Sequence, residues 1–370
     1  MVTPVTRSQV LGFRVRAQQL DRDGLEPADA SVLDLGVQDS GTDGARWALV
    51  NRGVDLSRLA ADELVKVWTL RGAPHLYRRR DLPAVAAAIE PFSDADAGKR
   101  IFDASKPLKE AGIGNLAALD AVAAAMREVV TRPMTKGEVS TRLTALMDPP
   151  YLRFCRACNA THLFEMPFRL AALRAGLELE EATSPPVLRP VPGFRQAATI
   201  LPRYDVVRAC LRLLGPATPK QVAGYLDAPV KDVRTRWPDD VVEVSVEGEP
   251  RWVLSDDEAR LPDSAAVATT RLLGPFDLFL QARDRPTLVS DPSRARALWP
   301  VLGRPGAVLL NGEIAGLWRP RASGRQLRVR VELWADGSAS ARRAVARQAE
   351  RLAAYRGVTL AGIDLDGVPA

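Results

Sequence analysis

The sequence predicts an α+β protein in which two or three short helices followed by a pair of strands recur three times, ahead of a small C-terminal β-domain. Its 370 residues are enough for two to four domains with a substantial buried core. In the first two thirds of the chain, apolar residues at helical spacing alternate with short segments of strand-like alternation. We therefore divide the chain into units spanning residues 1–92, 93–195, 196–262 and 263–370.

The first unit begins with an amphipathic stretch over 8–20, and Pro27 opens a second short helix that runs to Val37. A third helix is predicted over 45–51, after the turn SGTDG. Two β-rich segments around a Gly-Ala-Pro turn then predict a hairpin over 65–78.

The second unit is predicted to start with a helix over 115–130. Thr135 and Glu138 have the spacing of a capping box, so another helix should follow them. We expect a long helix over 150–175, and then two short strands, LELEEAT and PVLRPVP, around a turn.

The third unit has the clearest pattern. A helix over 203–215 ends at a glycine, and Thr218 followed by Pro219 marks the start of the next. A third helix over 229–238 precedes a hairpin over 241–254. Three helices followed by a hairpin is the order of a winged helix-turn-helix domain, and we predict that domain in all three units.

The last unit changes character. The segments PTLV, AVLLN, EIAGLW and LRVRVELW are predicted strands separated by Gly and Pro turns, which favours a small β-barrel or sheet. A helix over 338–355 and a strand over 358–364 complete it.

The charge balance favours an anionic partner. The formal net charge is +6, the sequence pI is about 9.5, and only 7 of the 51 basic residues are Lys. Arginine grips phosphates and guanine edges with two parallel hydrogen bonds. The segment 64–80 carries no carboxylate, so its hairpin is suited to lie along a phosphate backbone; the alternative is a solvated surface hairpin. Candidate nucleic-acid contacts are Arg46, Lys66, Arg71, His75, Arg78, Arg79 and Arg80.

Several classes of protein are not expected. The N-terminal residues lack the apolar core of a secretory signal, no run of eighteen apolar residues is present, and three Cys do not make a disulfide framework. We therefore expect a cytoplasmic, nucleoid-associated protein. No nucleotide-binding or metalloprotease motif occurs, and no cofactor is expected.

One cysteine motif invites a zinc interpretation. Cys155 and Cys158 are separated by two residues, and His162 follows. On the predicted helix these side chains share one face, which fits packing equally well. Because a structural zinc site needs four ligands and further soft donors lie far along the chain, we expect no metal.

Three passages resemble the winged-helix DNA glycosylases of the AlkZ/YcaQ type. WTLRGAPHL (68–76) is similar to the family's W-x-x-R-G-T-x-H-L segment. LGVQD (35–39) falls where the family carries a Q-Φ-Q or Q-Φ-D catalytic motif. GRPGAVLLNGEIAGLW (303–318) resembles the C-terminal G-R-P…V-L-x-D-G-x-x-x-G-x-W strand pair, so the resemblance extends over nearly the whole chain.

The catalytic motif fits in two registers. With Gln38 in its last position, Gly36 stands where the family has its first Gln, and Asp39 follows the motif; we prefer this register. In the other register Gln38 is the first residue and Ser40 the last. The resemblance implies that Gln38 orients a water and Asp39 supplies charge during hydrolysis of the glycosidic bond of an alkylated purine. The alternative is that both residues cap the turn that follows them.

The resemblance implies double-stranded DNA with N7-alkylated purines as substrate, including bulky genotoxin adducts and interstrand crosslinks, in repair or antibiotic self-resistance. We expect a monomer without a membrane or an obligate protein partner. A non-catalytic winged-helix DNA-binding protein is the alternative, favoured by Gly36. A weaker one is a scaffold for protein interactions, which salt-dependent duplex binding would distinguish.

Overall fold

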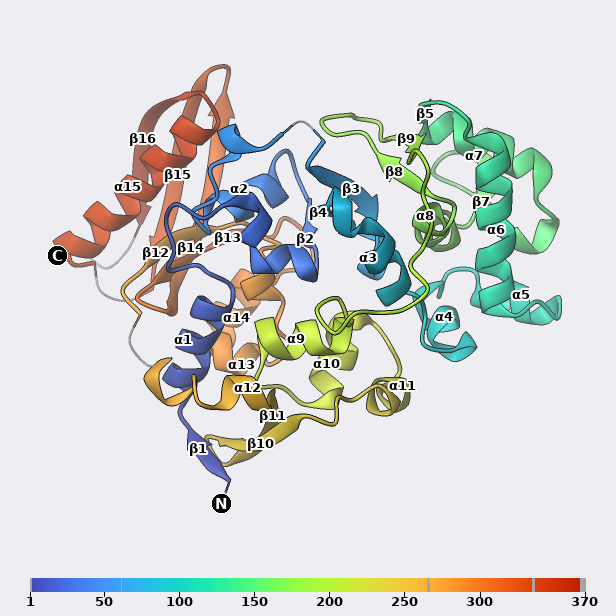
Figure 1. Ribbon diagram of the computed structural model, residues 1–370. Coiled ribbons are helices and arrows are strands. Elements are labelled where there is room, and N and C mark those ends of the chain that lie inside the picture. The colour runs from blue at the N-terminus through green and yellow to red at the C-terminus, as the bar shows by residue number, and fades with distance from the viewer. Residues whose placement is uncertain (1, 61, 265–266, 335–336, 367–370) are drawn as a thin grey trace.

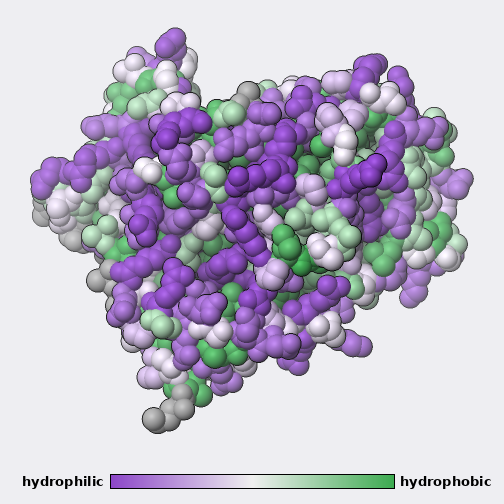
Figure 2. All heavy atoms as spheres, viewed as in Figure 1, coloured by the Kyte–Doolittle hydropathy of each residue, from purple (hydrophilic) through white to green (hydrophobic). Residues whose placement is uncertain are grey.

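The structure is a computed structural model that describes residues 2–60, 62–264, 267–334 and 337–366. It confirms a mixed α+β fold with several separate sheets (Figure 1). The face shown in Figure 2 is largely hydrophilic, with apolar residues gathered in small patches. Among the described residues, no helix combines the length and the apolar composition that crossing a bilayer requires.

A six-stranded sheet joins the strand pairs of the first two predicted units. Its order is β2 (Val37–Gln38), β4 (Pro74–Arg78), β3 (Leu64–Trp68), β8 (Leu177–Leu179), β9 (Val187–Pro190) and β5 (Met134–Thr135). The hairpin β3–β4 therefore lies inside the sheet, and only Lys66 and Pro74 among its strand residues are partly exposed. The expectation of an exposed hairpin along a phosphate backbone is wrong, because β2 and β8 flank it on both sides.

Helices pack around this sheet, and α5, α6 and α7 lie to its right in Figure 1. The long α6 is the centre of a second apolar core, against which α4, α5, α7 and α8 pack. Thr135 and Glu138 form the predicted capping box at the start of α7. The helices of this region are α2 (Gly44–Val50), α3 (Leu82–Ala88), α4 (Asp94–Arg100), α5 (Ser105–Glu110), α6 (Asn115–Val129), α7 (Lys136–Leu146) and α8 (Glu165–Arg174).

Two predicted helices are wrong. The stretch from Pro27 to Val37 forms two short 3-10 turns, Pro27–Asp29 and Ser31–Asp34, rather than one helix. The helix expected over 150–175 begins only at Glu165; before it the chain makes a two-stranded hairpin of β6 (Leu152–Cys155) and β7 (Ala160–Leu163). Asn159 takes a left-handed backbone conformation, with φ of 51°, which ends any helix there.

The third unit contains the predicted order of elements, α9 (Val206–Leu214), α10 (Pro219–Leu226), α11 (Val230–Thr235), β10 (Val241–Val246) and β11 (Glu249–Leu254), followed by the short α12 (Ser255–Glu258). Thr218 and Gln221 form a capping box before α10. The N-terminus also packs here rather than with the first unit. Strand β1 (Thr3–Val5) pairs in parallel with β10, and Val10 and Phe13 of α1 (Arg7–Ala17) share a core with Val244.

The C-terminal unit is a five-stranded sheet with consecutive order β12 to β16, so of the two expected forms a sheet is found. PTLV is not a strand, because residues Arg285–Leu288 form the short helix α13. Helix α15 packs against β12 and β16. The other elements are β12 (Thr270–Leu273), α14 (Pro292–Leu298), β13 (Gly306–Leu310), β14 (Glu313–Ser323), β15 (Gln326–Leu333), α15 (Ala339–Tyr355) and β16 (Thr359–Asp366).

Candidate functional site

Gln38 is the last residue of the edge strand β2, opposite His75 of β4. Because side chains alternate along a strand, Val37 is buried in the core while Gln38 is partly exposed. Gln38 Nε2 donates a hydrogen bond to Ser40 Oγ over 2.9 Å. Residues 38 and 40 therefore present polar groups on the same face of the chain.

Position 36 faces the core and not the side of the chain that carries the Gln38 amide. Its φ is +91°, and a Cβ built there would lie 2.4 Å from the ring and hydroxyl of the buried Tyr77. A side chain at position 36 would enter the core instead of joining Gln38. The geometry thus favours the register with Gln38 first and Ser40 last over the one that we preferred from the sequence.

Asp39 behaves as a capping residue. Its Oδ1 accepts a hydrogen bond from the backbone N–H of Ala45, 3.2 Å away, in the first turn of α2. Its Oδ2 lies 3.6 Å from Lys66 Nζ, and the two side chains are 19% and 12% exposed. Both oxygens of the carboxylate thus have a partner in the protein, which fits the turn-capping alternative, and a catalytic role for Asp39 stays a prediction.

Arg71 connects Gln38 to two other parts of the fold. Its Nη2 donates to Gln38 Oε1 at 3.2 Å and to Gln281 Oε1 at 2.6 Å, and its Nη1 donates to the backbone oxygen of Tyr225 at 2.7 Å. The guanidinium also lies 4.6 Å from the centre of the Tyr225 ring. Arg71 itself has a left-handed backbone, with φ of 59°. These contacts fix the Gln38 amide and engage both terminal nitrogens of the partly buried Arg71, so its DNA contact stays a prediction.

His75 is corrected as a DNA contact, because it is fully buried. Its Nδ1 lies 2.9 Å from Thr69 Oγ1 and 3.0 Å from the backbone oxygen of Ala73. Burial, with a smaller contribution from the positive charge of Arg71, lowers the pKa of His75 to about 3. The ring is therefore neutral and internal.

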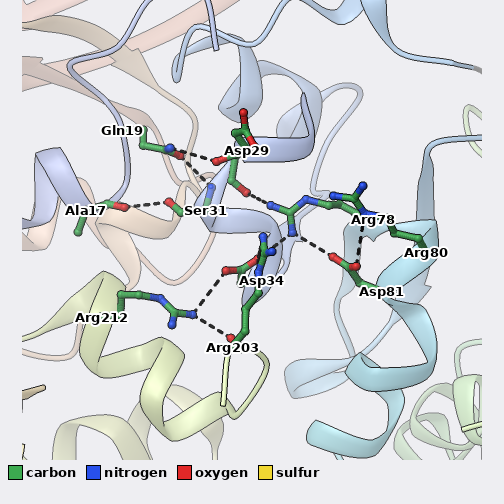
Figure 3. A network of polar contacts seen from close by, with 11 residues as sticks. Ala17, Gln19, Asp29, Ser31, Asp34, Arg78, Arg80, Asp81, Arg203 and Arg212 are labelled. Atoms are coloured by element: carbon green, nitrogen blue, oxygen red, sulfur yellow. Dashed lines mark hydrogen bonds and ion pairs between the residues drawn. The ribbon is translucent and has the colours of Figure 1, made fainter. Parts of the chain in front are cut away.

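Arg78 is the second correction. Only 2% of its side chain is exposed, and its Nη1 donates to Asp34 at 2.7 Å and Asp81 at 3.1 Å (Figure 3). Arg203 and Arg212 approach the same Asp34 carboxylate from the α9 side. Asp34 thus links the first unit to the third, and Arg78 is an internal partner of Asp34 that reaches no surface phosphate.

Of the remaining predicted cations, Lys66 is only 12% exposed beside Asp39, and the other three stay at the surface. Arg46 forms an exposed ion pair with Glu181. Arg79 is 28% exposed and paired with Glu178, 2.7 Å away, while Arg80 is 66% exposed. The Arg46–Glu181 pair is of the exposed kind that contributes little to stability and opens readily, whereas the Glu178 side chain beside Arg79 is only 2% exposed.

A cluster of three arginines near Arg71 was missed in the sequence: Arg283, Arg285 and Arg304. Burial and the charges of Arg71 and Arg285 lower the pKa of Arg283, and burial and Arg285 lower that of Arg304. Within the part of the chain that the structure describes, none of the three has an ion-pair partner. The Gly-Arg-Pro motif at 303–305 was the one sequence signal for them. We call these residues the arginine cluster.

Aromatic and apolar groups accompany the arginine cluster. The guanidinium of Arg285 lies 4.9 Å from the centre of the Trp299 ring, and that of Arg304 lies 4.8 Å from Phe276. Next to Arg304, Val301 and Leu302 are 99% and 86% exposed. Cations over aromatic faces beside an exposed apolar tip are typical of surfaces that bind nucleic acid.

Comparison with known proteins gives two matches. The model of the family described as DNA glycosylase AlkZ-like matches residues 32–355. The solved structure of the Streptomyces sahachiroi DNA glycosylase AlkZ superposes with a TM-score of 0.73 at 21% sequence identity, over 99% of this chain and 100% of that one. A search of curated protein sequences gave no match.

Proposed function

Because this chain belongs to the AlkZ-like DNA glycosylase family, we propose that it hydrolyses the N-glycosidic bond of N7-alkylated purines in double-stranded DNA. The family makes it a DNA glycosylase; the lesion and the residues named below are our proposal. The observation that carries the proposal is the pairing of Gln38 with Ser40 on one partly exposed face, with the Gln38 amide held by Arg71.

The chemistry needs a positioned water. An N7-alkylated purine already carries positive charge, so it leaves readily as the deoxyribose gains oxocarbenium character. We assign Gln38 and Ser40 to hold the attacking water by hydrogen bonds to their amide and hydroxyl groups. Arg71 is a positioning residue that fixes the Gln38 amide, and Asp39 shapes the loop by capping α2.

We assign the arginine cluster to the phosphate backbone, because its three guanidinium groups have no carboxylate partner among the described residues. The exposed Val301 and Leu302 would then meet the bases beside it. The order of α9–α11 and β10–β11 supports a winged-helix interpretation of the third unit, which we extend to the other two as duplex-binding modules.

The proposed substrates include bulky adducts and interstrand crosslinks. Gln38 and Ser40 are partly exposed, and a large adduct requires such access, whereas a closed base-flipping pocket suits small lesions. The proposed setting is a monomer that acts on chromosomal DNA in the cytoplasm, in repair or in self-resistance of an antibiotic producer.

The direct test uses duplex DNA that carries a single 7-methylguanine. Abasic sites are revealed by alkaline strand cleavage, and duplex binding is measured in parallel. We expect cleavage by the wild-type protein, and binding without cleavage by Gln38→Ala. Duplex binding by the wild-type protein without cleavage of any tested adduct would instead support a non-catalytic DNA-binding protein.

A further inference from the structure

A second cluster of chemically capable residues lies on the hairpin β6–β7. One possible ligand atom from each of Cys155, Cys158 and His162 lies within 4.8 Å of the other two. None of the three takes part in the contacts of Gln38 or Arg71, so the glycosidic chemistry leaves the cluster unexplained.

The hairpin brings these residues together. Cys155 pairs with Ala160 and Arg153 pairs with His162, so Cys155 and His162 lie diagonally on the same face of the hairpin. The turn between the strands carries Cys158, and the left-handed Asn159 returns the chain to β7. The hairpin thus brings the three potential ligand atoms of the Cys-x2-Cys-x3-His motif close together.

The positions of the three side chains suit metal binding. Cys155 is partly exposed and Cys158 is exposed, so both sulfurs are accessible to an ion. Cysteine binds metals as its thiolate. His162 Nδ1 lies 2.8 Å from the backbone oxygen of Leu163, the contact that orients a metal-binding histidine and leaves Nε2 as the ligand.

We propose that Cys155, Cys158 and His162 bind one zinc ion through two sulfurs and an imidazole nitrogen, with the fourth coordination position open to water. Thiolate and imidazole together suit zinc better than magnesium or calcium. Tetrahedral zinc places such ligand atoms about 3.6–3.8 Å apart. Because the three ligand atoms already lie within 4.8 Å of one another, zinc binding draws them together by no more than about 1 Å.

The ion crosslinks the turn of a hairpin whose base is held by Leu163 in the second apolar core. The strands β6 and β7 form a two-stranded sheet, and such a hairpin is marginal by itself. It leads directly into α8, where Arg169 Nη1 donates to the backbone oxygen of Gly72 at 3.1 Å and the Met166 side chain packs against Gly72. Gly72 follows Arg71, so the zinc-bound hairpin supports the turn that holds Gln38.

The test is metal analysis of the full-length protein, purified without chelators and dialysed against metal-free buffer. We expect about one zinc per chain in the wild type and in Arg156→Ala, which changes the exposed residue next to Cys155. Cys155→Ser and Cys158→Ser should each lose most of the zinc, and circular dichroism checks that they fold.

Cobalt gives a readout that does not depend on folding yield or activity. When Co²⁺ replaces zinc, thiolate-to-cobalt charge-transfer absorption should appear in the wild type and in Arg156→Ala, and should be greatly reduced in Cys158→Ser. A folded wild-type protein that takes up neither metal would overturn the proposal. So would full metal content in both serine variants, or a Cys155–Cys158 disulfide in the metal-free native protein.

Discussion

Gln38 and Ser40 share a hydrogen bond of 2.9 Å across the end of β2. The bond requires both side chains to lie on one face, which is also the face that Arg71 contacts through Gln38 Oε1. An amide and a hydroxyl held this way offer an acceptor and a donor to one water molecule. This pair is the part of the fold on which the proposed chemistry depends.

Loss of the Gln38 amide should remove most of the excision activity. Positioned groups that orient or deprotonate a reacting water contribute about 10²- to 10⁴-fold, so we expect Gln38→Ala to lower the single-turnover rate about 100-fold or more. Ser40→Ala removes one neutral hydrogen bond worth about 1 kcal/mol, roughly a fivefold effect. Duplex binding should change little in both variants. Wild-type rates in Gln38→Ala would remove this residue from the mechanism.

Gly36 tests the register of the motif. Gly36→Ala adds a Cβ 2.4 Å from Tyr77 at a position with φ of +91°, whereas Gly41→Ala has a similar φ of +80° and open space. Both should suffer backbone strain of about 1 kcal/mol, but only Gly36→Ala adds overpacking of about 1–3 kcal/mol. Thermal unfolding should therefore show a clearly lower Tm for Gly36→Ala. Ser40→Gln places a second amide on the face that carries Gln38, and this variant should retain activity.

Equal Tm values for the two glycine variants would contradict this packing argument. Recovery or gain of activity in Gly36→Gln, together with loss in Ser40→Gln, would restore the register with Gln38 in the last position.

Local signals in the sequence predicted much of the fold, because caps and turns act over a few residues. Thr135 with Glu138, and Thr218 with Pro219, begin helices where expected. Contacts between distant segments were not predictable in this way. Nothing near β1 indicates that it pairs with β10. Nor does the sequence around Arg78 show that it, unlike Arg79 and Arg80, is buried against Asp34, 44 residues away.

In the candidate site too, local sequence predicted some features, while others depend on contacts between distant segments. Gln38 was found by its motif, but the orientation of Gly36 depends on Tyr77 and could not be read from the spacing. The arginine cluster escaped notice because a single Arg in an Arg-rich chain carries no signal. Its significance comes from the lack of an ion-pair partner for its three guanidinium groups among the described residues, which only the fold reveals.

Arg71 should act on catalysis through Gln38 rather than on binding. Arg71→Lys keeps the charge but has no planar fork to reach Gln38, Gln281 and Tyr225 together. We expect kcat to fall about tenfold, or about 1.4 kcal/mol, with KM nearly unchanged. Arg46→Lys, which alters an exposed ion pair, is the matched control and should behave as wild type. A rise in KM with unchanged kcat in Arg71→Lys would indicate a DNA contact instead.

The arginine cluster should set the salt dependence of duplex binding. Each lost phosphate contact makes the slope of log K against log salt less negative by about 0.9. We expect Arg283→Ala and Arg285→Ala each to reduce the slope by about this amount and to weaken binding similarly for damaged and undamaged duplex. Lys106→Ala removes one charge from the exposed surface of α5 and should leave the slope unchanged. Identical slopes in all variants would exclude the cluster from the interface.

The buried His75 should make the fold sensitive to acid. Its pKa is about 3 in the folded protein, because burial disfavours the charged ring, and about 6.5 when the chain unfolds. Between these values the unfolded state binds more protons, so the free energy of unfolding rises with pH and is lost as the pH falls below about 6.5. The contribution of His75 to this slope approaches about 1.4 kcal/mol per pH unit within the window.

His75→Gln lacks the titrating group, and denaturant unfolding at a series of pH values should give a flatter profile for it. Because the carboxylates are common to both proteins, parallel profiles would show that His75 does not stay neutral in the fold.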